Sequence, residues 1–197
     1  MIKFFRKKRY DLMEKNKTGK YFKYAIGEII LVVIGILIAL SINNWNENRK
    51  DKKYLNQIFS SIEKELEESL IDIERVIPKQ MASADSIQTY LNNEEVSIYD
   101  IITRANGVHA PRIKTNAWNA IANSKIELIA YDKLSALADI EERKENLRWR
   151  LEKQMDFMFQ NMEKTDKAKK EMLMMTILDM VGAEKELQSK IKELIKK

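Results

Sequence analysis

Few residues in this chain have the types and spacing that catalysis requires. His109 is the only histidine, and it falls in a predicted loop with Gly107 and Pro111. It would need a serine nucleophile as its partner, yet the sequence contains no G-x-S-x-G elbow. Zero cysteines and one histidine exclude disulfides, thiolate zinc sites, iron–sulfur clusters, cysteine nucleophiles and multi-histidine metal sites. We therefore expect a protein that is not an enzyme, with no catalytic residue, no metal and no cofactor.

Two further patterns resemble functional sites but differ from them in detail. Thr18-Gly19-Lys20 looks like the end of a phosphate-binding loop, but Glu14 and Tyr21 stand where that motif has glycine and serine or threonine. The acidic residues that we interpret as solvated helix faces are Glu63, Glu65, Glu67, Glu68, Glu141, Glu142 and Glu145. Spacing singles out no two of these carboxylates, so a paired-carboxylate hydrolase stays an open alternative.

Methionine is concentrated in one region, with seven of the ten between Met155 and Met180. The spacing Met155-x-x-Met158 would suit Cu(I), which prefers soft thioether ligands. The same methionines lie on an apolar helical stripe, where methionine is an adaptable packing residue. We favour packing in the core or against a partner.

One segment is apolar enough to cross a membrane. Residues 25–42 contain a single charge, Glu28, and as a helix extend for about 27 Å, close to the about 30 Å of a bilayer's hydrocarbon core. Aromatic residues flank both ends, as in interfacial belts: Tyr21, Phe22, Tyr24 and Trp45. A buried helix and a cleaved signal peptide are the alternatives, but the segment exceeds the about 7–15 apolar residues of a signal peptide. We interpret it as an uncleaved transmembrane signal anchor that crosses once.

The positive charge is confined to residues 1–24, which carry nine basic groups against two acidic ones. The remaining residues carry 26 basic and 28 acidic groups. A juxtamembrane basic segment favours anionic lipid headgroups over nucleic acid, either as an amphipathic interfacial helix or as a disordered topology signal. The cluster expected to face lipid is Lys3, Arg6, Lys7, Lys8 and Arg9. The positive-inside rule then places residues 1–24 in the cytoplasm and 46–197 in the periplasm of a bacterial inner membrane.

Three residues of the predicted span form a candidate helix contact. On an ideal helix, Gly35 and Ala39 lie within about 20° of Glu28, which places the acid on a stripe of small residues. An ionisable group in a membrane is a functional candidate by default. The alternative is that Glu28 snorkels to the cytoplasmic headgroups and pairs with Lys20 or Lys23.

The opening of the chain resembles a known family. The similarity rests on Met1-Ile-Lys-Phe-Phe-Arg6, on the run from Tyr24 to Leu40 and on Asn43-Asn-Trp-Asn-Glu47, and it covers about residues 1–50. The family is an uncharacterised one of Bacteroidota, domain of unknown function number 6090. The resemblance implies a single-pass inner-membrane protein with a helical periplasmic part, for which this chain looks short. It brings no activity and no catalytic residue.

The distal residues predict long helices. One seam of apolar residues in 4-3 spacing runs from Leu55 to Val76 with Ser69 as its polar exception, and a second runs from Leu173 to Leu194 with Glu184 as its exception. Residues 137–162 follow a period closer to 3.6. We expect an all-α protein, with one transmembrane helix followed by a coiled-coil or bundle domain over 46–197.

Shorter elements are expected between the seams. Pro78 is predicted to end or kink the first helix at Ile77, with a short helix following up to Asn92. Ser97 and Thr115 are predicted helix caps, and Ser124 to Glu127 fits a capping box. Residues 105–115 form the expected loop. Asp132 is predicted to start a long helix, which Thr165-Asp166 interrupts.

These features favour a membrane-anchored interaction or scaffold module that pairs with copies of itself or with a membrane or periplasmic partner. A sensor or signalling subunit, an auxiliary subunit of an ion-driven machine and a tethered enzyme are the alternatives. The partner, the oligomeric state and any ligand are not encoded in a recognisable motif.

Overall fold

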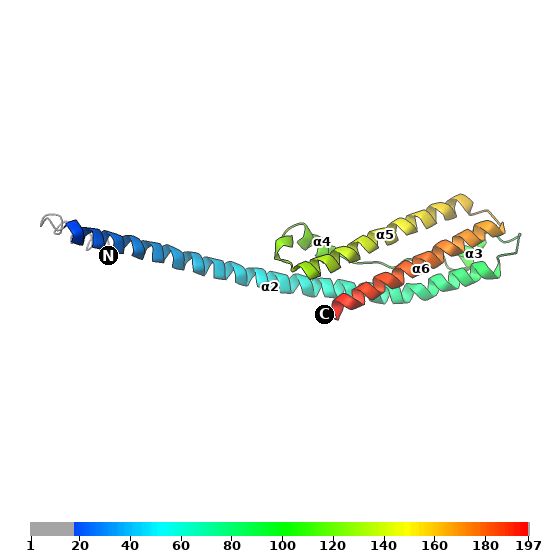
Figure 1. Ribbon diagram of the computed structural model, residues 1–197. Coiled ribbons are helices and arrows are strands. Elements are labelled where there is room, and N and C mark those ends of the chain that lie inside the picture. Colours follow the sequence, from blue (N-terminus) through cyan, green and yellow to red (C-terminus); the bar gives the residue numbers. More distant parts are fainter. Residues whose placement is uncertain (1–17, 197) are drawn as a thin grey trace. The chain divides into compact units, whose positions relative to one another are not determined.

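The computed structural model describes residues 18–196, and every regular element in this range is helical, which confirms the predicted all-α class. The elements in chain order are α2 (Thr18–Thr89), α3 (Ile98–Arg104), α4 (Asn116–Ala122), the 3₁₀ turn η1 (Ile126–Leu128), α5 (Tyr131–Asn161) and α6 (Lys167–Ile195) (Figure 1). The basic cluster Lys3, Arg6, Lys7, Lys8 and Arg9 lies outside the described residues.

The chain divides into two compact units, Met1–Tyr54 and Leu55–Lys197, and α2 contributes residues to both. In the first unit, the large apolar side chains from Ile26 to Ile42 are exposed around the helix. This helix is long and apolar enough to cross a membrane, and none of its most apolar 18-residue window is buried. The structure thus agrees with one candidate membrane helix near the N-terminus.

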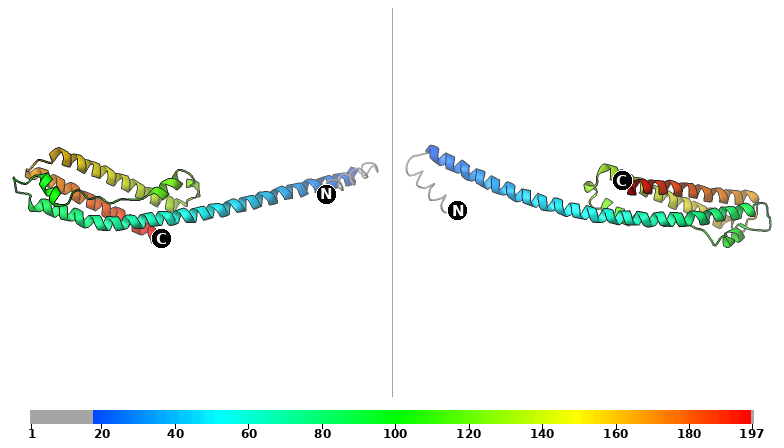
Figure 2. Two further views of the ribbon diagram at one scale, coloured as in Figure 1. Left: turned by 180° about the vertical axis from the view of Figure 1, so that it is seen from behind. Right: turned by 90° about the horizontal axis from the view of Figure 1, so that it is seen from below.

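The second unit is a bundle of three long helices. Residues 55–89 of α2 lie beside α5 and α6, and α6 runs antiparallel to α2 (Figures 1 and 2). Gln188 near the end of α6 therefore donates a hydrogen bond to Glu74, in the middle of residues 55–89 of α2. Both predicted seams face the interior; their fully or nearly buried members are Ile62, Leu66, Ser69, Ile73, Val76, Leu173, Ile177, Met180, Glu184, Leu187 and Ile191.

Helix α2 does not end at Pro78, so the part of the prediction that stopped it at Ile77 is wrong. Pro78 has no N–H to donate to the Glu74 carbonyl, so one helical hydrogen bond is missing. Because Pro78 is exposed, the missing bond lies on the solvent side of the helix. Buried residues continue along the opposite face through Ala84 and Ile87. The helix expected separately before Asn92 is therefore the last part of α2.

The connections between the long helices agree with the sequence at most positions. Ser97 and Asp100 form the capping box of α3, and Asp166 caps α6 by accepting a hydrogen bond from the Lys169 N–H. The capping box predicted at Ser124 is wrong, because the Ser124 hydroxyl instead donates to the Ala120 carbonyl behind it. Helix α5 begins at Tyr131, one residue before the predicted Asp132.

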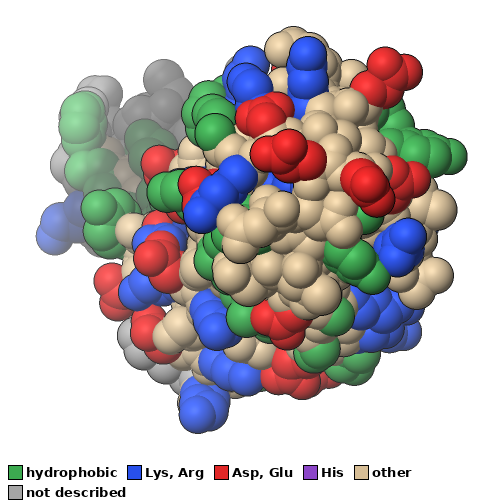
Figure 3. Space-filling view, turned by 90° about the vertical axis from the view of Figure 1, so that its right-hand side faces the viewer, with side chains coloured by type: hydrophobic (Ala, Val, Ile, Leu, Met, Phe, Trp, Pro, Cys, Tyr) green, Lys and Arg blue, Asp and Glu red, His purple; other side chains and the backbone are tan. Residues whose placement is uncertain are grey.

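Acidic and basic side chains are interspersed over the end of the bundle where α2 gives way to α3 and α5 to α6 (Figure 3). Beneath this end, side chains from α2, α3, α5 and α6 share one apolar cluster. Its buried members are Ala84, Ile87, Ile98, Ile101, Met158, Leu173 and Ile177. The short helix α3 is therefore part of the bundle core and closes this end.

Candidate functional site

The three membrane-stripe residues lie on one stretch of α2 within the first unit. Gly35 and Ala39 are exposed, and Glu28 is partly exposed. A Cβ built at Gly35 would meet nothing within 4 Å, so the glycine is not required by packing within this chain. The contact between this small-residue stripe and a second helix stays a prediction.

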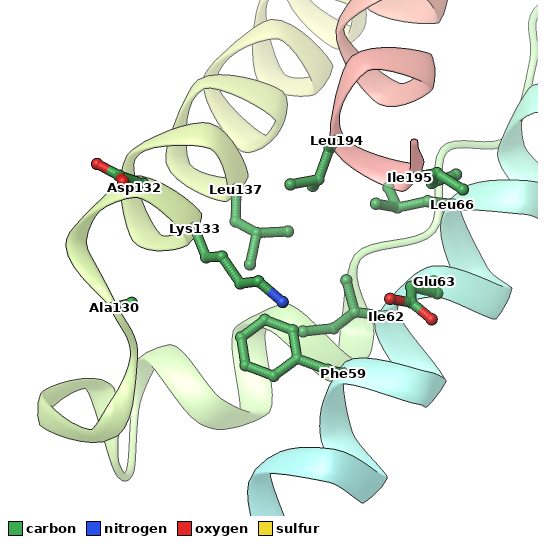
Figure 4. A pocket seen from close by; sticks show the side chains of 10 residues that line it. All are labelled: Phe59, Ile62, Glu63, Leu66, Ala130, Asp132, Lys133, Leu137, Leu194 and Ile195. Carbon is green, nitrogen blue, oxygen red and sulfur yellow. The ribbon is translucent and has the colours of Figure 1, made fainter. Parts of the chain in front are cut away.

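A pocket opens in the bundle between residues 59–66 of α2, the start of α5 and the end of α6 (Figure 4). Its volume is about 340 Å³, within the range of pockets that hold small molecules or inserted side chains. The residues that line it are Phe59, Ile62, Glu63, Leu66, Ala130, Asp132, Lys133, Leu137, Leu194 and Ile195. We name this cavity the α2–α5–α6 pocket.

The α2–α5–α6 pocket has an apolar floor and a charged side. Ile62, Leu66 and Leu137 are buried at its base. The Lys133 ammonium lies 4.5 Å from the centre of the Phe59 ring, a cation–π contact, and Figure 4 shows that Lys133 points into the pocket whereas Asp132 points away from it. Such a pocket suits an aliphatic or aromatic side chain of a partner, with polar backbone groups beside Lys133.

The predicted loop 105–115 is an extended segment that runs along the bundle between α3 and α4 (Figure 2). Side chains from one face of α2 bind its backbone. Ser69 accepts from the Lys114 N–H at 2.9 Å, and Asp72 accepts from the Arg112 N–H at 2.7 Å. The backbone hydrogen bond from Arg112 lowers the pKa of Asp72, which favours the ionised carboxylate. We name residues 105–115 the strap.

Thr115 is the last residue of the strap and the predicted cap of α4, but its side chain has a different role. Thr115 precedes α4 as expected, but its hydroxyl makes no cap bond. It accepts a hydrogen bond from the Lys144 ammonium at 2.8 Å, and Lys144 also pairs with Glu141 at 3.0 Å. The residue therefore joins the end of the strap to α5.

A polar pair lies in the core beneath the strap. The Gln80 amide nitrogen donates to a carboxylate oxygen of Glu184 at 2.8 Å and to the His109 carbonyl at 3.0 Å. Glu184 is 0% exposed, and burial raises its pKa to about 7, although the Gln80 hydrogen bond acts in the opposite direction. His109 thus contributes its backbone to the structure, and its ring nitrogen contacts the Ala105 carbonyl.

Sequence reasoning missed the contact residues Gln80 and Lys133, and also Lys170, a buried lysine of α6 that donates to the Tyr90 and Asn93 carbonyls. Each belongs to a residue type that is normally exposed, so composition gives no signal for it. Glu184 was visible as the polar exception in its seam. The methionines divide: Met158 and Met180 are buried in the core as expected, whereas Met172 and Met175 are exposed on α6.

Comparison with known proteins identifies a family and assigns no activity. Residues 28–124 match the model described as Family of unknown function (DUF6090). This match includes most of the apolar segment of α2, the residues of α2 that belong to the bundle, and the strap. No curated protein and no solved structure matches the chain.

Proposed function

We propose that this chain, a member of the DUF6090 family of unknown function, is a single-pass membrane anchor for a helical interaction module. The observation that carries the proposal is the exposed apolar surface of residues 26–42 in a chain whose second unit is a bundle with its own core. Twelve exposed large aliphatic side chains on one helix are costly in water and favourable in a bilayer, at about 25 cal/mol per Å² of apolar surface. The module is thereby held at a membrane surface.

The orientation that we propose follows from the basic leader. Residues 1–24 face the cytoplasm, the span acts as a signal anchor and the bundle stands in the periplasm of a bacterial inner membrane. The apolar helix supports insertion into a membrane. The excess of basic residues before this helix, which is absent after it, supports the proposed orientation.

Single-cysteine labelling tests this orientation, because the natural chain has no cysteine and gives no background. Ser60→Cys places a thiol on an exposed position of α2, and Lys7→Cys places one in the leader. In cells with a permeabilised outer membrane, an impermeant maleimide should label the Ser60→Cys chain, and it should reach the Lys7→Cys chain only after detergent. The reverse pattern would show that the topology is inverted.

The interaction role rests on the α2–α5–α6 pocket. An apolar floor with an ammonium beside it accommodates a partner's apolar side chain and the backbone carbonyl that precedes or follows it. The partner is either a second copy or another membrane or periplasmic protein. We propose this pocket as the place where that partner inserts.

Site-specific photo-crosslinking in cells tests the pocket. A photoreactive residue at Ala130, which lines the pocket, should give an adduct, whereas one at Glu152, exposed further along α5, should give none. Filling the cavity with Leu194→Trp should abolish the Ala130 adduct, and the adduct's mass separates a homodimer from another partner. Equal adducts at Ala130 and Glu152, or an adduct that survives Leu194→Trp, would contradict insertion at this pocket.

A further inference from the structure

Gln80 holds a fixed orientation in the core because of what surrounds it. Its amide group meets the His109 carbonyl, which can only accept, so the nitrogen must face that oxygen. The same nitrogen donates its second hydrogen to one oxygen of Glu184. Both hydrogens of the Gln80 amide are therefore used, one on the strap and one on α6.

This orientation leaves two acceptors without a donor. Gln80 Oε1 and Glu184 Oε2 are both buried and make no hydrogen bond within the described residues. A buried acceptor without a partner is costly, and a buried carboxylate charge without a cation is more so. A proton on Glu184 removes the charge and supplies the one donor that the pair lacks.

We propose that Glu184 is a proton-binding latch for the strap: the protonated acid and Gln80 hold residues 105–115 on the bundle, and loss of the proton releases them. The protonated acid is a neutral partner for the Gln80 amide, which in turn holds the His109 carbonyl. Ionisation puts an uncompensated charge at a position that is 0% exposed. The least costly response is for the strap to lift and admit water.

The cavity beside the acid gives that water a route. A hollow of about 170 Å³, about the share of five or six waters in the liquid, lies between the strap, α5 and α6 with Glu184 on its wall. Strap residues Ala110, Pro111 and Ile113 line one side of it. Movement of the strap would therefore widen it.

The charged groups around Glu184 are already engaged. From α5, Lys144 and Arg148 line the same hollow. Lys144 is held by Glu141 and Thr115, and Arg148 lies 3.4 Å from Glu152 and 3.7 Å from Glu145. The strap offers His109, whose ring nitrogen contacts Ala105, and α2 offers the neutral Gln80. Burial sets the pKa of Glu184 at about 7, so the latch changes state near neutral pH.

Hydrogen–deuterium exchange of the full chain in detergent tests the latch. After correction for the intrinsic rates, the strap amides of Arg112 and Lys114 should exchange faster above pH 7, by up to about tenfold per pH unit. Glu184→Gln replaces the acid by an amide that is neutral at every pH and can both accept and donate, so it should hold the strap closed throughout. Glu193→Gln, an exposed acid on the same helix, should behave as the natural chain does.

Infrared difference spectroscopy of the natural chain provides a second readout, which detects the proton on the acid directly. The natural chain should show the carbonyl band of a protonated carboxylic acid that disappears as the pH rises through about 7, and Glu184→Gln should lack this band. Strap exchange that is independent of pH in the natural chain would overturn the latch. A pH dependence that persists unchanged in Glu184→Gln would overturn it as well.

Discussion

The Lys170 ammonium donates a hydrogen bond to the backbone carbonyl of Asn93, 2.6 Å away, although 77 residues separate them along the chain. It also donates to the Tyr90 carbonyl at 3.0 Å. Helix α2 ends at Thr89, and Tyr90 and Asn93 lie in the turn that follows it. A lysine from α6 that is 0% exposed thus caps this turn from outside, and burial lowers the pKa of this lysine.

Lys170→Met should destabilise the bundle by about 1–3 kcal/mol, because it removes the buried donor of the Asn93 carbonyl while preserving the apolar stem. The Tyr90 carbonyl still accepts from the Asn93 N–H at 3.2 Å. Urea denaturation of the full chain in detergent, followed by circular dichroism, measures this loss. Lys167→Met is the matched control, since Lys167 is exposed on the same turn and pairs with Glu171 at 3.8 Å. Equal, small losses for both variants would mean that the cap contributes nothing.

Substitution of the buried seam residues should destabilise the bundle, whereas substitution on the solvent-facing side of α2 should have little effect. Leu66→Ala or Leu187→Ala removes a side chain that is at most 1% exposed, and each should lower the free energy of unfolding by about 2–5 kcal/mol. Ile71→Ala is the control, because this side chain lies on the solvent-facing side of α2 and is 66% exposed. It should lower the free energy of unfolding by less than about 0.5 kcal/mol. Losses at Leu66 and Leu187 no larger than at Ile71 would show that the seams are not packed.

Stability should also depend on pH through Glu184. Its pKa of about 7 in the folded chain exceeds the ordinary 4.5, so the folded state holds the proton more tightly. The resulting stabilisation is complete below about pH 4.5 and is lost as the pH rises through about 7. Between about pH 5 and 8, the natural chain should lose about 2–3 kcal/mol relative to Glu184→Gln. Parallel stability curves for the two chains would contradict the raised pKa.

Sequence periodicity was enough to predict the bundle because burial of an apolar face is a local property of each helix. The polar exceptions in the two seams, Ser69 and Glu184, mark the positions where buried side chains make hydrogen bonds. The periodicity could not show what they bind. Ser69 meets Lys114 and Glu184 meets Gln80, contacts across 45 and 104 residues that depend on how the strap crosses the bundle.

The errors have a common physical cause. At Pro78, the local preference of proline to end a helix competed with packing of the helix in the bundle. At Ser124, a capping hydrogen bond competed with another local hydrogen bond. The continuing core face kept α2 helical past a proline, and the Ser124 hydroxyl found the carbonyl of Ala120 one turn back. The α2–α5–α6 pocket could not be predicted at all, since it is defined by where three helices end relative to one another within the bundle.

The membrane stripe of Glu28, Gly35 and Ala39 leads to the last prediction. Small residues let two helices approach closely in a bilayer, and a carboxyl group on the same stripe gains from a partner there. Because nothing lies within 4 Å of a Cβ at Gly35, Gly35→Leu adds bulk without a clash inside this chain. A change in behaviour would therefore report a contact with another span.

Gly35→Leu should weaken self-association or partner association in a membrane two-hybrid assay, because the larger side chain separates the helices. Glu28→Gln should weaken it less, since the amide keeps hydrogen bonding, and should alter its pH dependence. Leu37→Phe, which adds bulk on the face that we expect to meet lipid, serves as the control and should have no effect. If Gly35→Leu and Glu28→Leu both match the natural chain, residues 25–42 anchor the module without a helix contact.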